Sequence, residues 1–164
     1  MLALLLNAVA GCGYHMTNSQ SGRLEAAQKI WVPFFRNESI SPSAQTVLRR
    51  AFYEEIHALR GLNPAGSEGT ADLAMKARIV SYSNKVVSYN AIDQAREYSL
   101  SLDVELEIAK KGQLPPLWKG QIHAVKQYPA NTNLALQHNA EEQALDAVAR
   151  IIAHKFISAL EESY

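Results

Sequence analysis

Cys12 is the one cysteine among 164 residues, and its position gives it chemical meaning. A single thiol cannot form an internal disulfide, and it has no CxxC partner that would indicate zinc binding or thiol redox chemistry. It follows an apolar stretch, residues 1–11 (MLALLLNAVAG), which ends in small side chains. That stretch is too short to span a bilayer as a mature helix. The arrangement indicates an export leader, because the small side chains before the cysteine suit the narrow cleft of a signal peptidase.

The run Val9-Ala10-Gly11-Cys12 resembles the bacterial lipobox. The resemblance implies a signal peptide over residues 1–11 and fatty acyl groups, such as palmitate, on Cys12. Each buried methylene contributes about 0.8 kcal/mol and one chain binds only marginally, so two or three chains on one residue form a permanent anchor. Gly13 stands where an Asp would suggest inner-membrane retention, which favours the outer membrane. The alternative is a buried apolar N-terminal segment with an incidental cysteine, because no Lys or Arg precedes the apolar run.

Basic residues on the expected middle strands could bind phosphate if they gather on one surface. The candidates for a lipid head-group site are Lys85, Arg96, Lys119 and Lys126, with Lys76 and Arg78 as further members of the cluster. Apolar neighbours such as Val86, Val87 and Tyr89 could then meet acyl chains. The alternative is ordinary solvating charge that pairs with adjacent acids.

The remaining ionisable residues give no catalytic or metal-binding pattern. Five scattered histidines lack the spacing of metal ligands, and G-x-S-x-G and Gly-rich phosphate loops are missing. Asp103, Glu105 and Glu107 alternate along a strand and indicate a solvated face rather than acid–base catalysis. Sixteen basic residues balance sixteen acidic ones, so no global basic field favours nucleic acid. We therefore expect no enzyme, no cofactor, no metal site and no nucleic-acid partner.

Hydrophobic periodicity and turn residues predict six elements. Strands are expected at 29–35, 72–82, 98–108 and 117–128, and helices at 41–60 and 139–160. In the first strand Ile30, Val32 and Phe34 share one face, which favours Phe34 for the core. Residues 61–69 and 84–95 are expected to be loops, and Gly120 is expected to mark a β-bulge. Ser41-Pro42 should open the first helix, and Asn139 with Glu142 should open the second.

The order β-α-β-β-β-α predicts an α+β fold. Strict alternation from Tyr98 to Ile108 gives one dry and one wet face, so two helices should cover one face of a four-stranded mixed sheet in a two-layer sandwich. Residues 12–28 should form the lipidated N-terminus and tether, and residues 29–164 a single domain.

Several segments in order resemble the lipopolysaccharide-assembly LptE family. These are GCGYH at 11–15, IWVPFFRNES at 30–39, VSYS at 80–83, Ser88-Tyr89, Glu97-Tyr98 and LWKG at 117–120, followed by a long final helix. The resemblance implies a two-layer α/β sandwich. It also implies a lipoprotein on the periplasmic side of the outer membrane that plugs the LptD-like β-barrel, helps that barrel assemble and helps deliver lipopolysaccharide to the outer leaflet. Basic side chains would meet the phosphates of lipopolysaccharide.

Two other functions remain open at this point. The chain could be a periplasm-facing, lipid-anchored carrier or adaptor that binds an amphipathic ligand without a barrel partner. It could also be a hydrolase with an unrecognised site.

Overall fold

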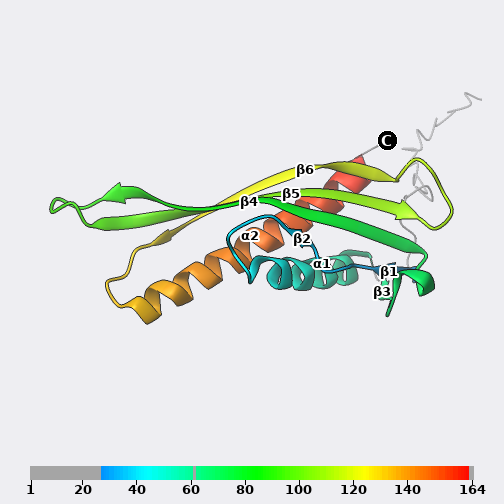
Figure 1. The fold of residues 1–164 in the computed structure, drawn as a ribbon, viewed down its shortest axis with the longest axis horizontal. Coiled ribbons are helices and arrows are strands. Elements are labelled where there is room, and N and C mark those ends of the chain that lie inside the picture. Colours follow the sequence, from blue (N-terminus) through cyan, green and yellow to red (C-terminus); the bar gives the residue numbers. More distant parts are fainter. Residues whose placement is uncertain (1–26, 61, 163–164) are drawn as a thin grey trace, which may run out of the picture.

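The protein forms two layers, with two helices against one face of a mixed sheet (Figure 1). The computed structural model describes residues 27–60 and 62–162, so the predicted leader, Cys12 and most of the tether lie outside the described residues. The elements are β1 Lys29–Trp31, β2 Arg36–Asn37, α1 Ala44–Arg60, β3 Asn63–Pro64, a 3₁₀ turn Glu68–Thr70, β4 Leu73–Tyr89, β5 Ala95–Lys110, β6 Trp118–Pro129 and α2 Leu134–Glu162. The predicted fold class is confirmed.

The sheet contains more strands than the four expected. Its order is β3-β1-β4-β5-β6, and β2 also pairs with β4. The first three strands run parallel to their neighbours, and the β4–β5 and β5–β6 pairs are antiparallel. The two extra strands, β2 and β3, are each two residues long, and β3 lies in the predicted 61–69 loop. Such short edge strands carry no hydrophobic period, so the sequence gives no signal for them.

The predicted first strand breaks in two, and this break overturns the prediction for Phe34. Trp31 pairs with Ala74 and Arg36 pairs with Arg78, so this segment takes five steps where β4 takes four. The extra residue reverses the alternation, and Phe35 is buried while Phe34 is 64% exposed. The guanidinium of Arg49 lies 4.5 Å from the centre of the Phe34 ring.

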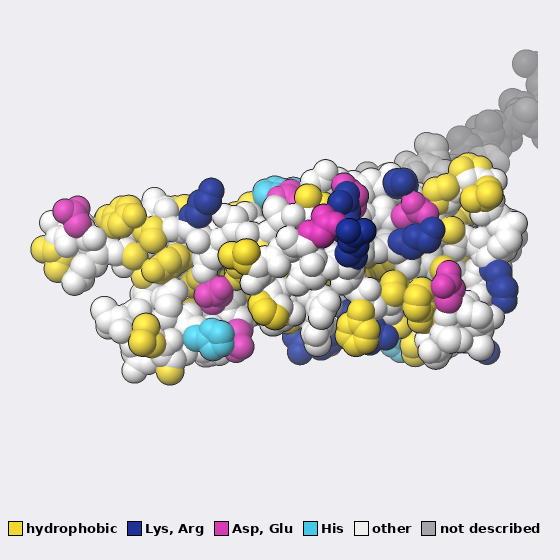
Figure 2. Space-filling view, in the orientation of Figure 1, with side chains coloured by type: hydrophobic (Ala, Val, Ile, Leu, Met, Phe, Trp, Pro, Cys, Tyr) yellow, Lys and Arg dark blue, Asp and Glu magenta, His cyan; other side chains and the backbone are white. Residues whose placement is uncertain are grey.

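β4 and β5 form one long hairpin that extends past the helix layer at one end (Figures 1 and 2). The predicted connection 84–95 is wrong, since β4 continues to Tyr89 and only residues 90–94 turn. Asn90 closes that turn because its Oδ1 accepts hydrogen bonds from the N–H groups of Ile92 and Gln94, each at 3.0 Å. The second half of β4 has serine, asparagine and lysine among its apolar residues, which obscured its period.

Helix α2 begins five residues before the predicted start. Asn133, not Asn139, is the N-cap: its Oδ1 accepts from the N–H groups of Ala135 at 2.9 Å and Leu136 at 3.2 Å. Helix α1 begins at Ala44, slightly after the predicted Ser41-Pro42 opening. The first turns of α2 face solvent, so the apolar stripe that guided the prediction starts only further along the helix.

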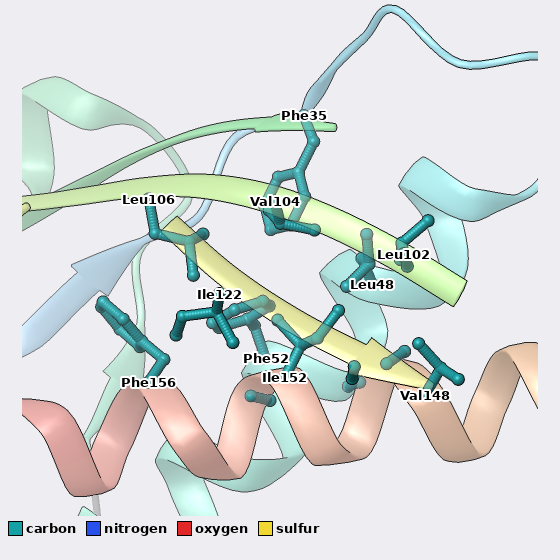
Figure 3. Packing of buried hydrophobic residues seen from close by; sticks show 14 of the residues in the cluster. Phe35, Leu48, Phe52, Leu102, Val104, Leu106, Ile122, Val148, Ile152 and Phe156 are labelled. Atoms are coloured by element: carbon teal, nitrogen blue, oxygen red, sulfur yellow. The ribbon is translucent and has the colours of Figure 1, made fainter. Parts of the chain in front are cut away.

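The core lies between the helices and the proximal part of the sheet, which is the part nearest β1 and β3 (Figure 3). Phe52 of α1 contacts both Phe35 and Phe156 of α2 edge to face, with ring centres 5.4 and 5.5 Å apart. Trp118 meets Phe156 from the sheet side at 5.2 Å. These contacts fix the two helices against the sheet.

Gly120 is explained by close packing and not by the predicted bulge. The β5–β6 pairing runs without a register shift from Glu97–Pro129 to Ile108–Trp118. A Cβ atom at position 120 would lie 2.7 Å from two ring carbons of Trp118. The tryptophan ring therefore requires a residue without a side chain here.

Candidate functional site

The face of the sheet that points away from the helices carries rows of alternating charge. In one row Glu107 on the central strand lies between Lys76 and Lys119, with nitrogen–oxygen distances of 3.4 and 3.3 Å. Partial burial acts to raise the pKa of Glu107. The hydrogen bonds from Lys119 and Lys76 outweigh it, so the pKa lies below its ordinary value. This carboxylate stays ionised and holds both lysines.

A second row is also internally paired. Arg78 bonds Glu105 at 2.6 Å and Glu38 at 2.9 Å, and Arg36 pairs with the same Glu38 at 3.0 Å. The hydrogen bond and charge of Glu105 raise the pKa of Arg78. The two rows line a shallow hollow of about 500 Å³. Lys76, Arg78 and Lys119 therefore form ion pairs with adjacent carboxylates, which is the alternative to a phosphate-binding cluster.

The other three predicted head-group residues lie in the distal half of the sheet, the half that extends beyond the helix layer. Lys85 pairs with Ser99 on the charged face, whereas Lys126 pairs with Leu100, whose side chain points towards the helices. Arg96 sits at a register shift near the end of the hairpin. Within residues 27–60 and 62–162, the charged groups of these three side chains form no ion pair or hydrogen bond.

The four predicted site residues are therefore not one cluster. Lys119 belongs to the proximal rows, and its partner Glu107 lies eight residues along β5 from Ser99, the partner of Lys85. At 3.4 Å per residue this separation is about 27 Å. Lys85, Arg96 and Lys126 share the distal end but approach it from both faces of the sheet.

A layer of three tyrosines and an asparagine separates the distal end from the hydrophobic core. We call this the tyrosine layer: Tyr82, Asn84, Tyr98 and Tyr128. The Asn84 amide donates to the Tyr128 hydroxyl at 2.6 Å, and the Tyr98 and Tyr128 rings stack with centres 5.6 Å apart. The Tyr82 hydroxyl donates to Glu141 of α2. Burial, and then this carboxylate, raise the pKa of Tyr82.

The tyrosine layer is not predicted from the sequence, because Asn84 falls in the segment 84–95 that was expected to be a loop. Its signal was the alternation of Tyr82, Asn84 and Val86, which is out of phase by one residue with that of Leu73, Met75 and Ile79 because the register shifts between Ile79 and Ser81. The Asn84 Oδ1 atom is buried and has no hydrogen-bond partner. The polar layer marks the point where the closed core gives way to the distal end.

Exposed apolar side chains concentrate at this distal end. They occupy two arms, the hairpin tip with Val87, Tyr89 and Ile92 and the first turn of α2 with Leu134 and Leu136. Ile92 is 71% exposed and Leu134 is 85% exposed. Figure 2 shows hydrophobic side chains on both arms, with a hollow between them. Apolar arms with unpaired cations behind them suit a ligand that has both acyl chains and phosphates.

The described residues offer little to a hydrolytic mechanism. Asp103 lies between Ser81 and His123: the Ser81 hydroxyl donates to one carboxylate oxygen at 2.5 Å and His123 Nδ1 lies 2.9 Å from the other. A histidine must contact the serine hydroxyl directly to act as its general base, and here it does not. The same part of the chain contains no group of three metal-ligating side chains. Neither described helix is long and apolar enough to cross a membrane.

Comparison with known proteins agrees with this picture. A family model described as LptE, lipopolysaccharide-assembly, matches residues 27–160. No curated protein sequence matches the chain. The fold is similar to rare lipoprotein B of Shewanella oneidensis, at 15% identity and a TM-score of 0.55, over 81% of this chain and 93% of that one. It is also similar to the PelC dodecamer of Paraburkholderia phytofirmans, at 14% identity and a TM-score of 0.54, over 88% and 95%.

Proposed function

Because the chain belongs to the LptE lipopolysaccharide-assembly family, a family of non-enzymatic assembly lipoproteins, we propose that it plugs an LptD-like barrel of the outer membrane. In this function it helps the barrel assemble and helps move lipopolysaccharide to the outer leaflet. Acyl chains on Cys12 anchor it on the periplasmic side. The family match supports a role in lipopolysaccharide assembly, and the barrel and the anchor are the parts that we add.

The distal end is the observation that carries this proposal. Lys85, Arg96 and Lys126 are the basic side chains there, and the described chain gives them no carboxylate partner. Phosphate oxygens of a lipid A-type head group would fill that role, and the two apolar arms would contact its acyl chains. Lys119 is the weaker member of the proposed set because Glu107 already neutralises it.

The charged face supports contact with a polar barrel wall. In its proximal rows the carboxylates and cations are already paired with each other, so this part of the face can lie against a polar surface without leaving an unpaired buried charge. The paired rows therefore suit contact with the barrel wall, whereas the unpaired distal cations suit the phosphates of a bound lipid.

Co-purification from native membranes in mild detergent tests the proposal. The lipidated wild-type chain should recover a large outer-membrane barrel in stoichiometric amounts. A variant of the two other distal cations, R96Q/K126Q, should still recover the barrel, since the paired rows of the charged face do not include these residues. Recovery of a monomer without any barrel would contradict the plug and would favour the lipid-anchored carrier.

A further inference from the structure

The second half of β4 has an open edge. Strands β1 and β2 pair with the first half of β4, and their pairing ends at Ile79. The chain then turns away, because Asn37 Oδ1 accepts from the Ser39 N–H at 2.9 Å and Asn37 Nδ2 donates to the Ser41 carbonyl at 2.7 Å. From residue 80 to Tyr89, no strand among the described residues covers that side of β4. An uncovered edge is a template for strand addition.

The backbone groups that face this edge can be identified from the register. Lys111, just beyond β5, donates to the Asp72 carbonyl, whereas the Arg96 carbonyl accepts from Ala130 beyond β6. Backbone groups alternate in direction along a strand, so odd-numbered residues of β5 face β4 and even-numbered ones face β6. Ser99 and Ser101 therefore bond to their β4 partners, Lys85 and Ser83. The N–H and C=O groups of the β4 residues that alternate with these two partners point outward. These outward residues are Tyr82, Asn84 and Val86.

The side chains along the edge define the strand that would fit. On the helix side an incoming strand would meet Tyr82 and Val86, which favour apolar or aromatic cross-strand neighbours. On the charged face it would meet two serines and then Lys85, which has no ion-pair partner even though Glu97 lies two positions from its neighbour Ser99. A carboxylate opposite Lys85 would complete that site.

A second copy of this chain fits the edge less well. Pairing two β4 edges antiparallel places Lys85 against serine or against a second Lys85, and never against a carboxylate. The paired segment would also be only about eight residues long, which is small beside the interfaces of stable dimers. A partner that already surrounds the chain needs no such area, because its other contacts hold the strand nearby.

We propose that the open edge of β4 binds an extended segment of the barrel partner as an added strand, with an acidic side chain opposite Lys85. This inference rests on the proposed function for the identity of the partner. The recognition uses main-chain hydrogen bonds to Tyr82, Asn84 and Val86, and the side chains on the two faces select the sequence.

Site-specific photocrosslinking of the full lipidated chain in native membranes tests the proposal. The probe is placed at Ser83, on the edge strand. The matched control is Ser101, its cross-strand partner on the same face but on the central strand. We expect cross-links from Ser83 to one acidic, alternating segment of the barrel, at least about tenfold above those from Ser101.

Two variants separate edge pairing from simple proximity. V86P removes an outward N–H from the β4 edge, and V125P removes one from the opposite edge, where Lys155 already bonds the His123 carbonyl. We expect V86P to weaken the Ser83 cross-link roughly five- to tenfold and V125P to leave it unchanged. K85Q should weaken it as well, without disturbing the backbone, in case V86P lowers the melting temperature.

The outcomes distinguish this inference from the proposed function. A barrel that co-purifies while Ser83 and Ser101 cross-link equally would overturn the added strand and leave the plug intact. Cross-links from Ser83 to a second copy of the chain would also overturn it.

Discussion

The Trp118 ring lies directly over Gly120, so that a Cβ atom at position 120 would sit 2.7 Å from two of its ring carbons. The same ring packs against Phe156 of α2. A glycine two residues along β6 thus lets the tryptophan lie flat between the sheet and the final helix. The LWKG segment therefore has a structural purpose: its tryptophan and glycine act as one packing unit.

Replacing Gly120 with alanine should destabilise the fold. The methyl group would displace the Trp118 ring, and such overpacking costs about 1–3 kcal/mol. Chemical denaturation with tryptophan fluorescence would measure the change. The control is G66A, where nothing lies within 4 Å of an added Cβ, and which should stay within about 1 kcal/mol of wild type. Equal effects from both variants would refute the packing explanation.

The cap of α2 gives a second prediction. Removing the Asn133 side chain should cost about 1 kcal/mol, because it leaves the N–H groups of Ala135 and Leu136 without their acceptor. N139A is the control, since Asn139 lies inside the helix and alanine is the better helix former there. Circular dichroism during urea unfolding should show N133A less stable, and N139A equal to wild type or slightly more stable. The reverse order would restore the helix start predicted from the sequence.

Asp146 joins the two helices and should make stability depend on pH. Its carboxylate bonds Arg50 of α1 at 2.6 Å and Arg150 of α2 at 2.9 Å. The bond from Arg150, with that from Arg50, lowers the pKa of Asp146 despite partial burial. A lowered pKa stabilises the fold above about pH 4, and this contribution is lost as the pH falls further.

The D146N variant should therefore be less stable than wild type at pH 7, and the two should converge as the pH falls from about 5 to 3. Thermal unfolding at several pH values measures this. D93N, at the exposed hairpin turn, is the control and should follow wild type throughout. A D146N deficit that persists unchanged at pH 3 would contradict the role of the ionised carboxylate.

The proposed acyl anchor on Cys12 is tested by the C12S variant. Because the hydrophobic core of the described chain is built from residues between Ile30 and Leu160, we expect this variant to keep its melting temperature and to leave the membrane fraction. Fractionation with immunoblotting provides the measurement. A variant that stays with the membrane would show that Cys12 is not the anchor.

Strong periodic patterns in the sequence predicted the architecture, and particular side chains explain where prediction failed. Strand β5 alternates without interruption, and its buried and charged faces follow from that pattern. Phe34 and Phe35 could not be told apart, because the residue that reverses their alternation is visible only in the pairing with β4. Gly120 suggested a bulge, because the sequence does not show that the Trp118 ring folds over position 120 and excludes a side chain there.

The candidate site was predicted in part. The sequence named Lys85, Arg96, Lys119 and Lys126 as one group, but it could not show that Lys119 would be neutralised by Glu107 from the neighbouring strand. The exposure of Leu134 and Leu136 depended on where α2 begins, which the sequence misplaced. The distal end thus depends on tertiary structure. The β4–β5 hairpin extends past the helices, and α2 begins at Leu134, before its predicted start.

Direct binding of purified lipopolysaccharide to the full lipidated chain tests the central claim most closely. The distal variant K85Q/R96Q/K126Q should bind at least about tenfold more weakly than wild type, with reduced salt dependence, because three unpaired charges are removed. A proximal variant, K29Q/K110Q/K111Q, removes the same charge from the other end and should bind as wild type does. Equal loss in both variants, or no loss in the distal one, would contradict the assignment of lipopolysaccharide to the distal end.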